Sequence, residues 1–229
     1  MNPIIALLTD FGTKDYFVGA MKGVILSINP GAKIIDITHE IPPQDISSGS
    51  FTLRACYKNF PSETIFVAVV DPGVGSNRKA IICETKNHLF LAPDNGLLSF
   101  IFDEAATFRV YKLENEKFFK HPVSSTFHGR DIFAPVAAHL SNGLKANEFG
   151  SEIYDFVRFE ENKPRKVSDK GIEAEIIHTD RFGNLITNLM QKDLPERFTL
   201  EINETKIEKM QNFFAEAENG ELFMILEGF

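Results

Sequence analysis

Three aspartates stand directly after short apolar runs in the first half of this 229-residue chain. Asp10 follows IIALLT, Asp71 follows IFVAVV and Asp94 follows HLFLAP. If these runs are parallel strands of one sheet, their carboxyl ends meet at the edge where open α/β sheets bind ligands. A single aspartate in such a place is more often a helix cap or a turn former, so the set of three is what indicates a site.

The segment DPGVGSNR, residues 71–78, places a carboxylate and a guanidinium at the two ends of a glycine turn. Its GxG pattern after a strand is also found in phosphate-binding loops. However, both GxGxxG and GxxxxGK[ST] are absent, and the residues that follow predict a strand and not a helix. Dinucleotide binding is therefore disfavoured.

The segment SSTFHGRDIFAP, residues 124–135, contains a histidine, an arginine and an aspartate. We expect His128, Arg130 and Asp131 to lie in a loop directly before a helix, whose first turn favours an anion. Asp131 is predicted to be the N-cap of that helix. His128 is the titratable group that can face a cleft.

Other catalytic patterns are missing. The remaining histidines are not paired at metal-ligand spacing, and there is no HExxH or Cys-His cluster, so no metal or other cofactor is predicted. GxSxG does not occur, and neither Cys56 nor Cys83 neighbours a histidine. We expect both cysteines to be free thiols in a reducing compartment.

Composition and charge narrow the class of protein. Hydrophobic residues make up 43% and charged residues 24% of the chain, which is typical of a globular protein. The net charge of -8 and the absence of a long basic run disfavour a nucleic-acid partner. No stretch of about 18 apolar residues and no basic leader occurs, so we expect a cytoplasmic protein without a membrane partner.

Strand and helix patterns alternate through the first 160 residues. Buried strands are predicted at 3–9, 32–38 and 64–70, with helices over 16–31 and 46–60 between them. Residues 79–85 and 88–92 predict a hairpin, 97–104 a short helix, and 131–143 a helix with Pro135 in its first turn. This alternation predicts a mainly parallel α/β sheet covered by helices.

The alternation of strand and helix patterns ends near residue 160. We predict an α/β domain over 1–160, a polar linker over 161–170 and a small β-rich, barrel-like domain over 171–229. The last of these contains three strand-like stretches: GIEAEIIHTDRFGNLITNLM, FTLEINETKIEKM and ELFMILEG.

Six motifs in unbroken order resemble the S-adenosyl-L-methionine hydroxide adenosyltransferase family, which is related to the bacterial fluorinase and chlorinase. They are LLTDFGTKDYFVGAMKG, DITHEIPPQDI, VVDPGVGSNR, APDNGLL, TFHGRDIFAPVAA and DRFGNLITN. The resemblance implies hydrolysis of S-adenosyl-L-methionine to adenosine and L-methionine without a metal. It also implies a homotrimer, in which each site lies between the first domain of one subunit and the second domain of its neighbour.

The resemblance also implies roles for individual residues. Asp71, Arg78 and His128 surround the attacking water, with the choice of Asp71 or His128 as base left open. The substrate contacts that it implies are Asp10 and Asp15 for the ribose, Phe127 for an apolar wall, and Asp180, Phe182 and Asn184 for the adenine and methionine ends. DRFGN is equally a good β-turn sequence in its own right.

Two alternatives remain open from the sequence. In the family the β-rich domain continues beyond a strand like ELFMILEG, whereas this chain stops at Phe229 and reads as shortened. A protein that binds adenosine or S-adenosyl-L-methionine without turnover is therefore one alternative. The bare residues Asp10, Asp71, Asp94 and His128 also fit a metal-dependent hydrolase. Halide enzymes differ at HGR and at the Asp of DPGVG, so the presence of His128 and Asp71 favours water as the nucleophile.

Overall fold

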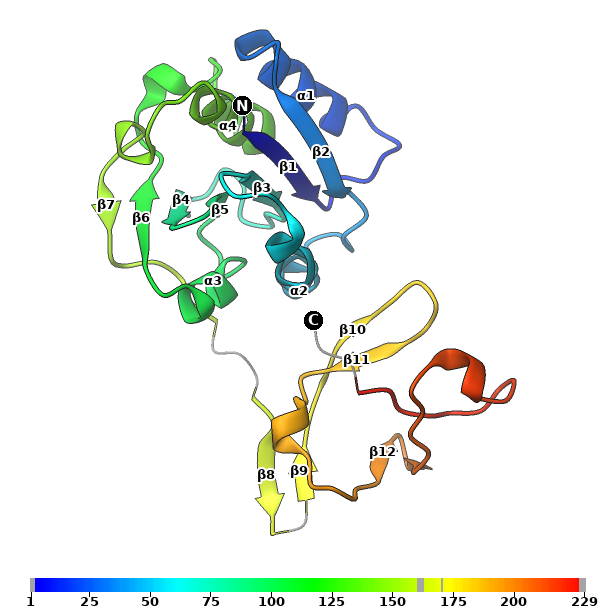
Figure 1. The fold of residues 1–229 in the computed structure, drawn as a ribbon. Coiled ribbons are helices and arrows are strands. Elements are labelled where there is room, and N and C mark those ends of the chain that lie inside the picture. The colour runs from blue at the N-terminus through cyan, green and yellow to red at the C-terminus, as the bar shows by residue number, and fades with distance from the viewer. Residues whose placement is uncertain (1–2, 160–162, 170, 227–229) are drawn as a thin grey trace. The chain divides into compact units, whose positions relative to one another are not determined.

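A seven-stranded mixed sheet forms the centre of the first of two units (Figure 1). The computed structural model describes residues 3–159, 163–169 and 171–226, and the units are Met1–Glu161 and Asn162–Phe229. The strand order is β2-β1-β3-β5-β4-β6-β7. The strands are β1 (Ile4–Thr9), β2 (Lys33–Thr38), β3 (Ile65–Val69), β4 (Ala80–Thr85), β5 (Leu89–Pro93), β6 (Phe108–Lys112) and β7 (Glu152–Ile153).

The predicted parallel sheet and hairpin are both confirmed. Strands β2, β1, β3 and β5 run parallel to one another. Strand β4 pairs antiparallel with β5. Strands β6 and β7 then extend the sheet from β4, and each of them is antiparallel to the strand before it. The carboxyl ends of β1, β3 and β5 therefore lie side by side.

Helices cover both faces of this sheet. Alternate side chains of β1 point to opposite faces, as the pleat of a strand requires. Ile5 and Leu7 pack with α1 (Phe17–Ile28) and α4 (Ala134–Ser141). Ala6 and Leu8 pack with α2 (Ile46–Cys56) and α3 (Ser99–Glu104). Strand β3 and residues 4–8 of β1 are apolar because both faces of these strands are buried.

The strands described in the second unit form short antiparallel pairs, and two short 3-10 helices, Gln191–Asp193 and Phe214–Glu216, accompany them. Strand β8 (Arg165–Ser168) pairs with β9 (Gly171–Glu173), β10 (Ile176–Thr179) with β11 (Leu185–Thr187), and β12 (Leu200–Ile202) with β13 (Thr205–Ile207). The predicted β-rich character is confirmed. A closed barrel is not confirmed, since these pairs form three separate two-stranded sheets within the described residues.

Two details of the second unit differ from the sequence prediction. Strand β8 lies inside the segment 161–170 that was predicted to be a linker, because its backbone pairs with β9 although its side chains are polar. The stretch ELFMILEG forms only an isolated bridge between Met224 and Met210 in its described part, and residues 227–229 lie outside the described residues.

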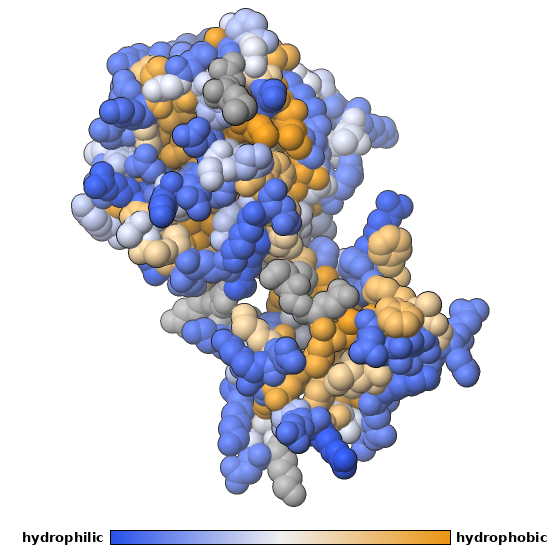
Figure 2. All heavy atoms as spheres, in the orientation of Figure 1, coloured by the Kyte–Doolittle hydropathy of each residue, from blue (hydrophilic) through white to orange (hydrophobic). Residues whose placement is uncertain are grey.

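Many large apolar side chains of the second unit are exposed, and Figure 2 shows part of this surface in orange. They are Val167, Ile172, Ile176, Phe182, Leu185, Met190, Met210, Phe213, Phe214, Leu222 and Leu226. An apolar surface of this kind is typical of a region that contacts another protein surface. Among the helices that the structure describes, none has the length and apolar character needed to cross a membrane.

Candidate active site

The three aspartates predicted from the sequence stand at one edge of the sheet. Asp10 follows β1, Asp71 follows β3 and Asp94 follows β5, and these strands are parallel neighbours. Burial raises the pKa of Asp10, and the charge of nearby Asp71 adds to this effect. Asp10 and Asp71 therefore follow neighbouring strands at the same edge of the sheet.

Asp94 has a structural role at this edge. Its side chain accepts the backbone N–H of Val157 at 2.8 Å, and the residue is buried. Burial raises the pKa of Asp94 above its ordinary value. The carboxylate thus holds the returning chain near residue 157 against the end of β5.

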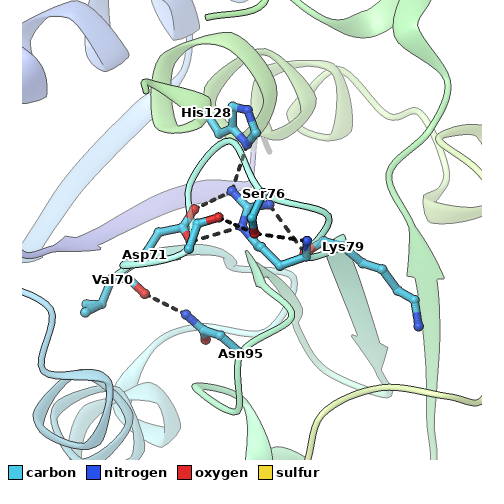
Figure 3. A network of polar contacts seen from close by, with 8 residues as sticks. Val70, Asp71, Ser76, Lys79, Asn95 and His128 are labelled. Atoms are coloured by element: carbon cyan, nitrogen blue, oxygen red, sulfur yellow. Dashed lines mark hydrogen bonds and ion pairs between the residues drawn. The ribbon is translucent and has the colours of Figure 1, made fainter. Parts of the chain in front are cut away.

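Asp71 and Arg78 form a nearly buried ion pair across the glycine turn (Figure 3). Arg78 Nε donates to Asp71 Oδ1 at 3.0 Å, and Arg78 Nη2 donates to Asp71 Oδ2. The side chains are only 4% and 10% exposed, respectively. A two-point pair of this kind fixes both orientation and distance, so it explains why one charge stands at each end of the turn.

Hydrogen bonds within the turn hold the pair in place. Ser76 Oγ donates to the carbonyl of Gly73 at 2.7 Å and accepts from the backbone N–H of Arg78 at 3.3 Å. Asn95 Nδ2 donates to the carbonyl of Val70 at 2.8 Å, which fixes the end of β3 directly before Asp71 (Figure 3). Sequence reasoning missed Ser76 and Asn95, although Ser76 lies in the motif DPGVGSNR and Asn95 lies in the motif APDNGLL.

His128 completes the cluster. Arg78 Nη2 lies 2.8 Å from His128 Nδ1. A guanidinium can only donate, so Nδ1 accepts and the ring proton of the neutral imidazole is on Nε2. Burial, followed by the positive charge of Arg78, lowers the pKa of His128 below its ordinary value. His128 is therefore a neutral side chain whose Nε2–H is a hydrogen-bond donor.

A π-helical turn over Gly129–Phe133 begins directly after His128, which is its N-cap residue, and continues into α4. The prediction that Asp131 is an N-cap is wrong, because the helical segment already begins before it. Asp131 is fully buried and accepts from Arg130 Nε at 2.6 Å and from the backbone N–H of Ser124 at 2.9 Å. It fastens the loop that leads to His128.

Gly75 brings the two loops of the site into direct contact. Its φ is +79°, and a Cβ added there would lie 2.2 Å from the backbone oxygen of Ser125. Only a residue without a side chain allows the turn after Asp71 to approach the loop before His128 this closely. Gly75 of DPGVG therefore serves loop packing.

The predicted substrate contacts of the first unit, Asp10, Asp15 and Phe127, differ in solvent exposure. Asp10 is half-buried, and its Oδ2 accepts the backbone N–H of Gln44 at 2.8 Å. Asp15 is exposed. Phe127 is buried and packs edge-on against Phe11 and Phe17, with ring centroids 5.9 and 5.2 Å apart.

Asp180, Phe182 and Asn184 form a tight turn between β10 and β11. Asp180 Oδ1 accepts the backbone N–H groups of Phe182 and Asn184 at 2.8 and 2.9 Å, and Oδ2 accepts from Asn184 Nδ2 at 2.7 Å. The β-turn predicted from DRFGN is confirmed. It leaves the ring of Phe182 exposed at the tip.

Most of the chain matches two domains of a known protein family. Residues 5–150 match the SAM hydroxide adenosyltransferase N-terminal domain, and residues 174–229 match the C-terminal domain of the same family. The chain belongs to the SAM hydroxide adenosyltransferase family. The resemblance inferred from the six motifs is thereby confirmed.

The relatives of this family member carry two different names, (R)-S-adenosyl-L-methionine hydrolase and fluorinase. The (R)-S-adenosyl-L-methionine hydrolase of Methanocaldococcus jannaschii is 42% identical, over 85% of this chain and 70% of the relative. A fluorinase of an Actinoplanes species is 32% identical, over 84% of this chain and 74% of the relative. The crystal structure of an uncharacterized conserved protein from Thermotoga maritima has a TM-score of 0.87 and 37% identity, and it covers 97% of this chain and 88% of its own.

The cluster in this family member has the chemistry of a site for a small polar reactant. It combines a carboxylate, a guanidinium and a neutral imidazole N–H within one hydrogen-bonded group. Within residues 3–159, 163–169 and 171–226, no three or more His, Cys, Asp or Glu side chains are arranged to hold a metal ion. The arrangement is suited to orienting a water molecule and taking up its proton.

Proposed function

We propose that this protein hydrolyses S-adenosyl-L-methionine to adenosine and L-methionine. The observation that carries the proposal is the Asp71–Arg78–His128 cluster at the carboxyl edge of the sheet. It occurs in a chain that is 35–42% identical to four relatives named (R)-S-adenosyl-L-methionine hydrolase. The reaction joins the oxygen of water to ribose C5′ and breaks the C5′–S bond, whose electron pair leaves with sulfur as the neutral thioether of methionine.

The leaving group requires no acid, so the protein has to align one water and remove its proton. We assign the role of base to Asp71. The Nε2–H of His128 can donate to the water oxygen, but it cannot accept a proton while Arg78 occupies Nδ1. The charge of Arg78 stabilises the hydroxide character that develops on the water.

Substrate contacts are proposed from the family resemblance. Asp10 and Asp15 accept hydrogen bonds from the ribose hydroxyls, and Phe127 supplies an apolar wall near the reacting carbon. Asp180, Phe182 and Asn184 contact the adenine and methionine ends. The exposed ring of Phe182, which Asp180 and Asn184 hold at the tip of a turn, supports a stacking role.

A homotrimer is part of the same proposal, with each site between the first domain of one subunit and the second domain of its neighbour. The exposed apolar side chains of the second unit support a subunit contact. A barrel-like form of the β-rich unit is also part of this proposal. The free thiols of Cys56 and Cys83 support a cytoplasmic location.

The test is chromatography of S-adenosyl-L-methionine incubated with the protein. The two epimers at sulfur are supplied separately, with and without EDTA, chloride or fluoride. We expect adenosine and methionine in equal amounts, unaffected by EDTA. A 5′-halo-5′-deoxyadenosine as the main product would reassign the nucleophile. If adenosine binds tightly but S-adenosyl-L-methionine stays intact under all conditions, the protein has a binding function and is not a hydrolase.

A further inference from the structure

His39 is buried at the carboxyl edge of the sheet, directly after β2, and is only 3% exposed. Its Nδ1 lies 2.8 Å from Thr9 Oγ1, at the end of β1 and one residue before Asp10. The backbone carbonyl of His39 accepts the N–H of Gly12 at 2.7 Å. One residue therefore supports both ends of the turn that carries Asp10.

The same turn is joined to the segment after β2 by further hydrogen bonds. Gln44 donates its backbone N–H to Asp10 Oδ2 at 2.8 Å, and Thr13 Oγ1 donates to Glu40 Oε1 at 3.0 Å. These last two contacts lie at the more exposed side, whereas the contacts of His39 are in the interior. His39 is thus the buried centre of the contact between residues 9–13 and 38–44.

The carboxylate of Asp36 lies beside the His39 ring. His39 Nε2 lies 3.1 Å from Asp36 Oδ1, without the alignment of a regular hydrogen bond. Lys22 Nζ donates to the other oxygen of Asp36 at 2.6 Å. The negative charge of the Asp36 carboxylate favours a proton on Nε2, and in that tautomer Nδ1 accepts from the Thr9 hydroxyl. That hydroxyl also accepts the backbone N–H of Phe11 at 3.2 Å.

The order Asp36, His39, Thr9 has the residue types of a nucleophilic triad, but Thr9 is fully buried and no substrate reaches its oxygen. The group is therefore suited to positioning. We propose that His39, oriented by Asp36, is a positioning residue that holds the turn of Asp10 in the geometry needed to bind the ribose hydroxyls. This inference rests on the proposed function, since it assigns the ribose to Asp10.

The test compares His39→Leu and Thr9→Val with the unchanged protein. Each variant removes the interior bond between His39 and Thr9, and Thr9→Val keeps the side-chain shape. We expect the KM for S-adenosyl-L-methionine to rise about 10-fold or more with little change in kcat, because binding is lost in the ground state and transition state alike. Preference for adenosine over 2′,3′-dideoxyadenosine, measured as inhibition constants, should fall by a similar factor. A purely structural role would not change that preference.

A double-mutant cycle gives the decisive result. If His39 acts through Asp10, His39→Leu adds little further loss of ribose preference in an Asp10→Ala background. An additive loss, or an unchanged preference in both single variants, overturns the inference. His88→Leu is the matched control, because His88 is also buried but packs among the rings of Tyr57, Phe66 and Phe90 at the start of β5. Absence of hydrolysis by the unchanged protein would instead refute the proposed function.

Discussion

Arg78 holds Asp71 and His128 at the same time, since its Nη2 donates both to a carboxylate oxygen of Asp71 and, over 2.8 Å, to Nδ1 of His128. The two bonds use the two hydrogens of one nitrogen. The positions of the carboxylate and the imidazole are therefore coupled through a single planar group. The contact also determines which nitrogen of His128 carries the proton.

Replacing Arg78 by lysine tests this coupling. Lysine keeps the charge, but it cannot reproduce the two-point contact with Asp71 together with the bond to His128. We expect Arg78→Lys to lower kcat by about 100-fold, a size typical of a misplaced acid–base group. Steady-state kinetics would measure the effect, and circular dichroism would show that the fold is retained. Near-normal kcat would mean that charge alone is required.

The pH dependence of the reaction follows from His128. Burial, with the charge of Arg78, lowers the pKa of this imidazole from its ordinary value of 6.5. The neutral form is the one that accepts from Arg78, so kcat should stay constant from neutral pH down to 6.5 and fall only as the pH falls through the lowered pKa of His128. Stability should change with the same sign. Because the unfolded state takes up a proton first, the free energy of unfolding falls as the pH falls from 6.5 through the lowered pKa.

Substitutions of His128 separate a donor from a base. Glutamine presents an N–H near the position of Nε2, whereas alanine presents nothing. We expect His128→Gln to retain at least about 10-fold more activity than His128→Ala, because a well-placed donor still orients the water. If His128 were the base, both variants would be equally inactive. Initial rates at pH 7.5 would distinguish these outcomes.

The order and type of the main elements could be predicted because their patterns are local. The runs at 4–8 and 65–70 are apolar at every position, which is typical of a strand that is covered on both faces. The start of the helix after His128 could not be predicted in this way. Asp131 looks like a cap in sequence, but its buried pairing with Arg130 and Ser124 depends on the tertiary fold.

The candidate site was predictable to a similar extent. Asp10 and Asp71 were recognisable as members of a set of three aspartates that follow strands, although each one alone is a weak signal, and the six motifs indicated Arg78 and His128. The support of His39 for Thr9 was not predictable, since the two residues are 30 positions apart and neither stands in a catalytic pattern. The β8 strand was missed because its residues are polar and its pairing partner alone defines it.

Removal of metal should leave the rate unchanged. The side chains that would form a metal site are already engaged: Asp71 with Arg78, Asp10 with the N–H of Gln44, and Asp94 with the N–H of Val157. Within the part of the chain that the structure describes, no group of three or more His, Cys, Asp or Glu side chains could hold a metal ion. Activity measured after dialysis against EDTA, with and without added Mg²⁺, Mn²⁺ or Zn²⁺, checks this. A rate that is lost with EDTA and restored by one ion would support a metal-dependent hydrolase.

Gly75→Ala tests whether contact between the two loops sets the catalytic geometry. The new methyl carbon would lie 2.2 Å from the carbonyl oxygen of Ser125, and backbone on both sides leaves no flexible group to give way. We expect the loop before His128 to shift, kcat to fall by about 100-fold, and the free energy of unfolding to drop by about 2–4 kcal/mol. Kinetics and chemical denaturation measure the two effects.

Gly143→Ala is the matched control for this prediction. Gly143 also has a positive φ, +94°, but nothing lies within 4 Å of an added Cβ. The free energy of unfolding of Gly143→Ala should therefore fall by only about 1–2 kcal/mol, because alanine has to adopt the left-handed backbone conformation, and kcat should not change. The difference between the two variants isolates the cost of separating the Asp71 turn from the His128 loop. Equal effects on kcat would show that this close approach does not govern the reaction.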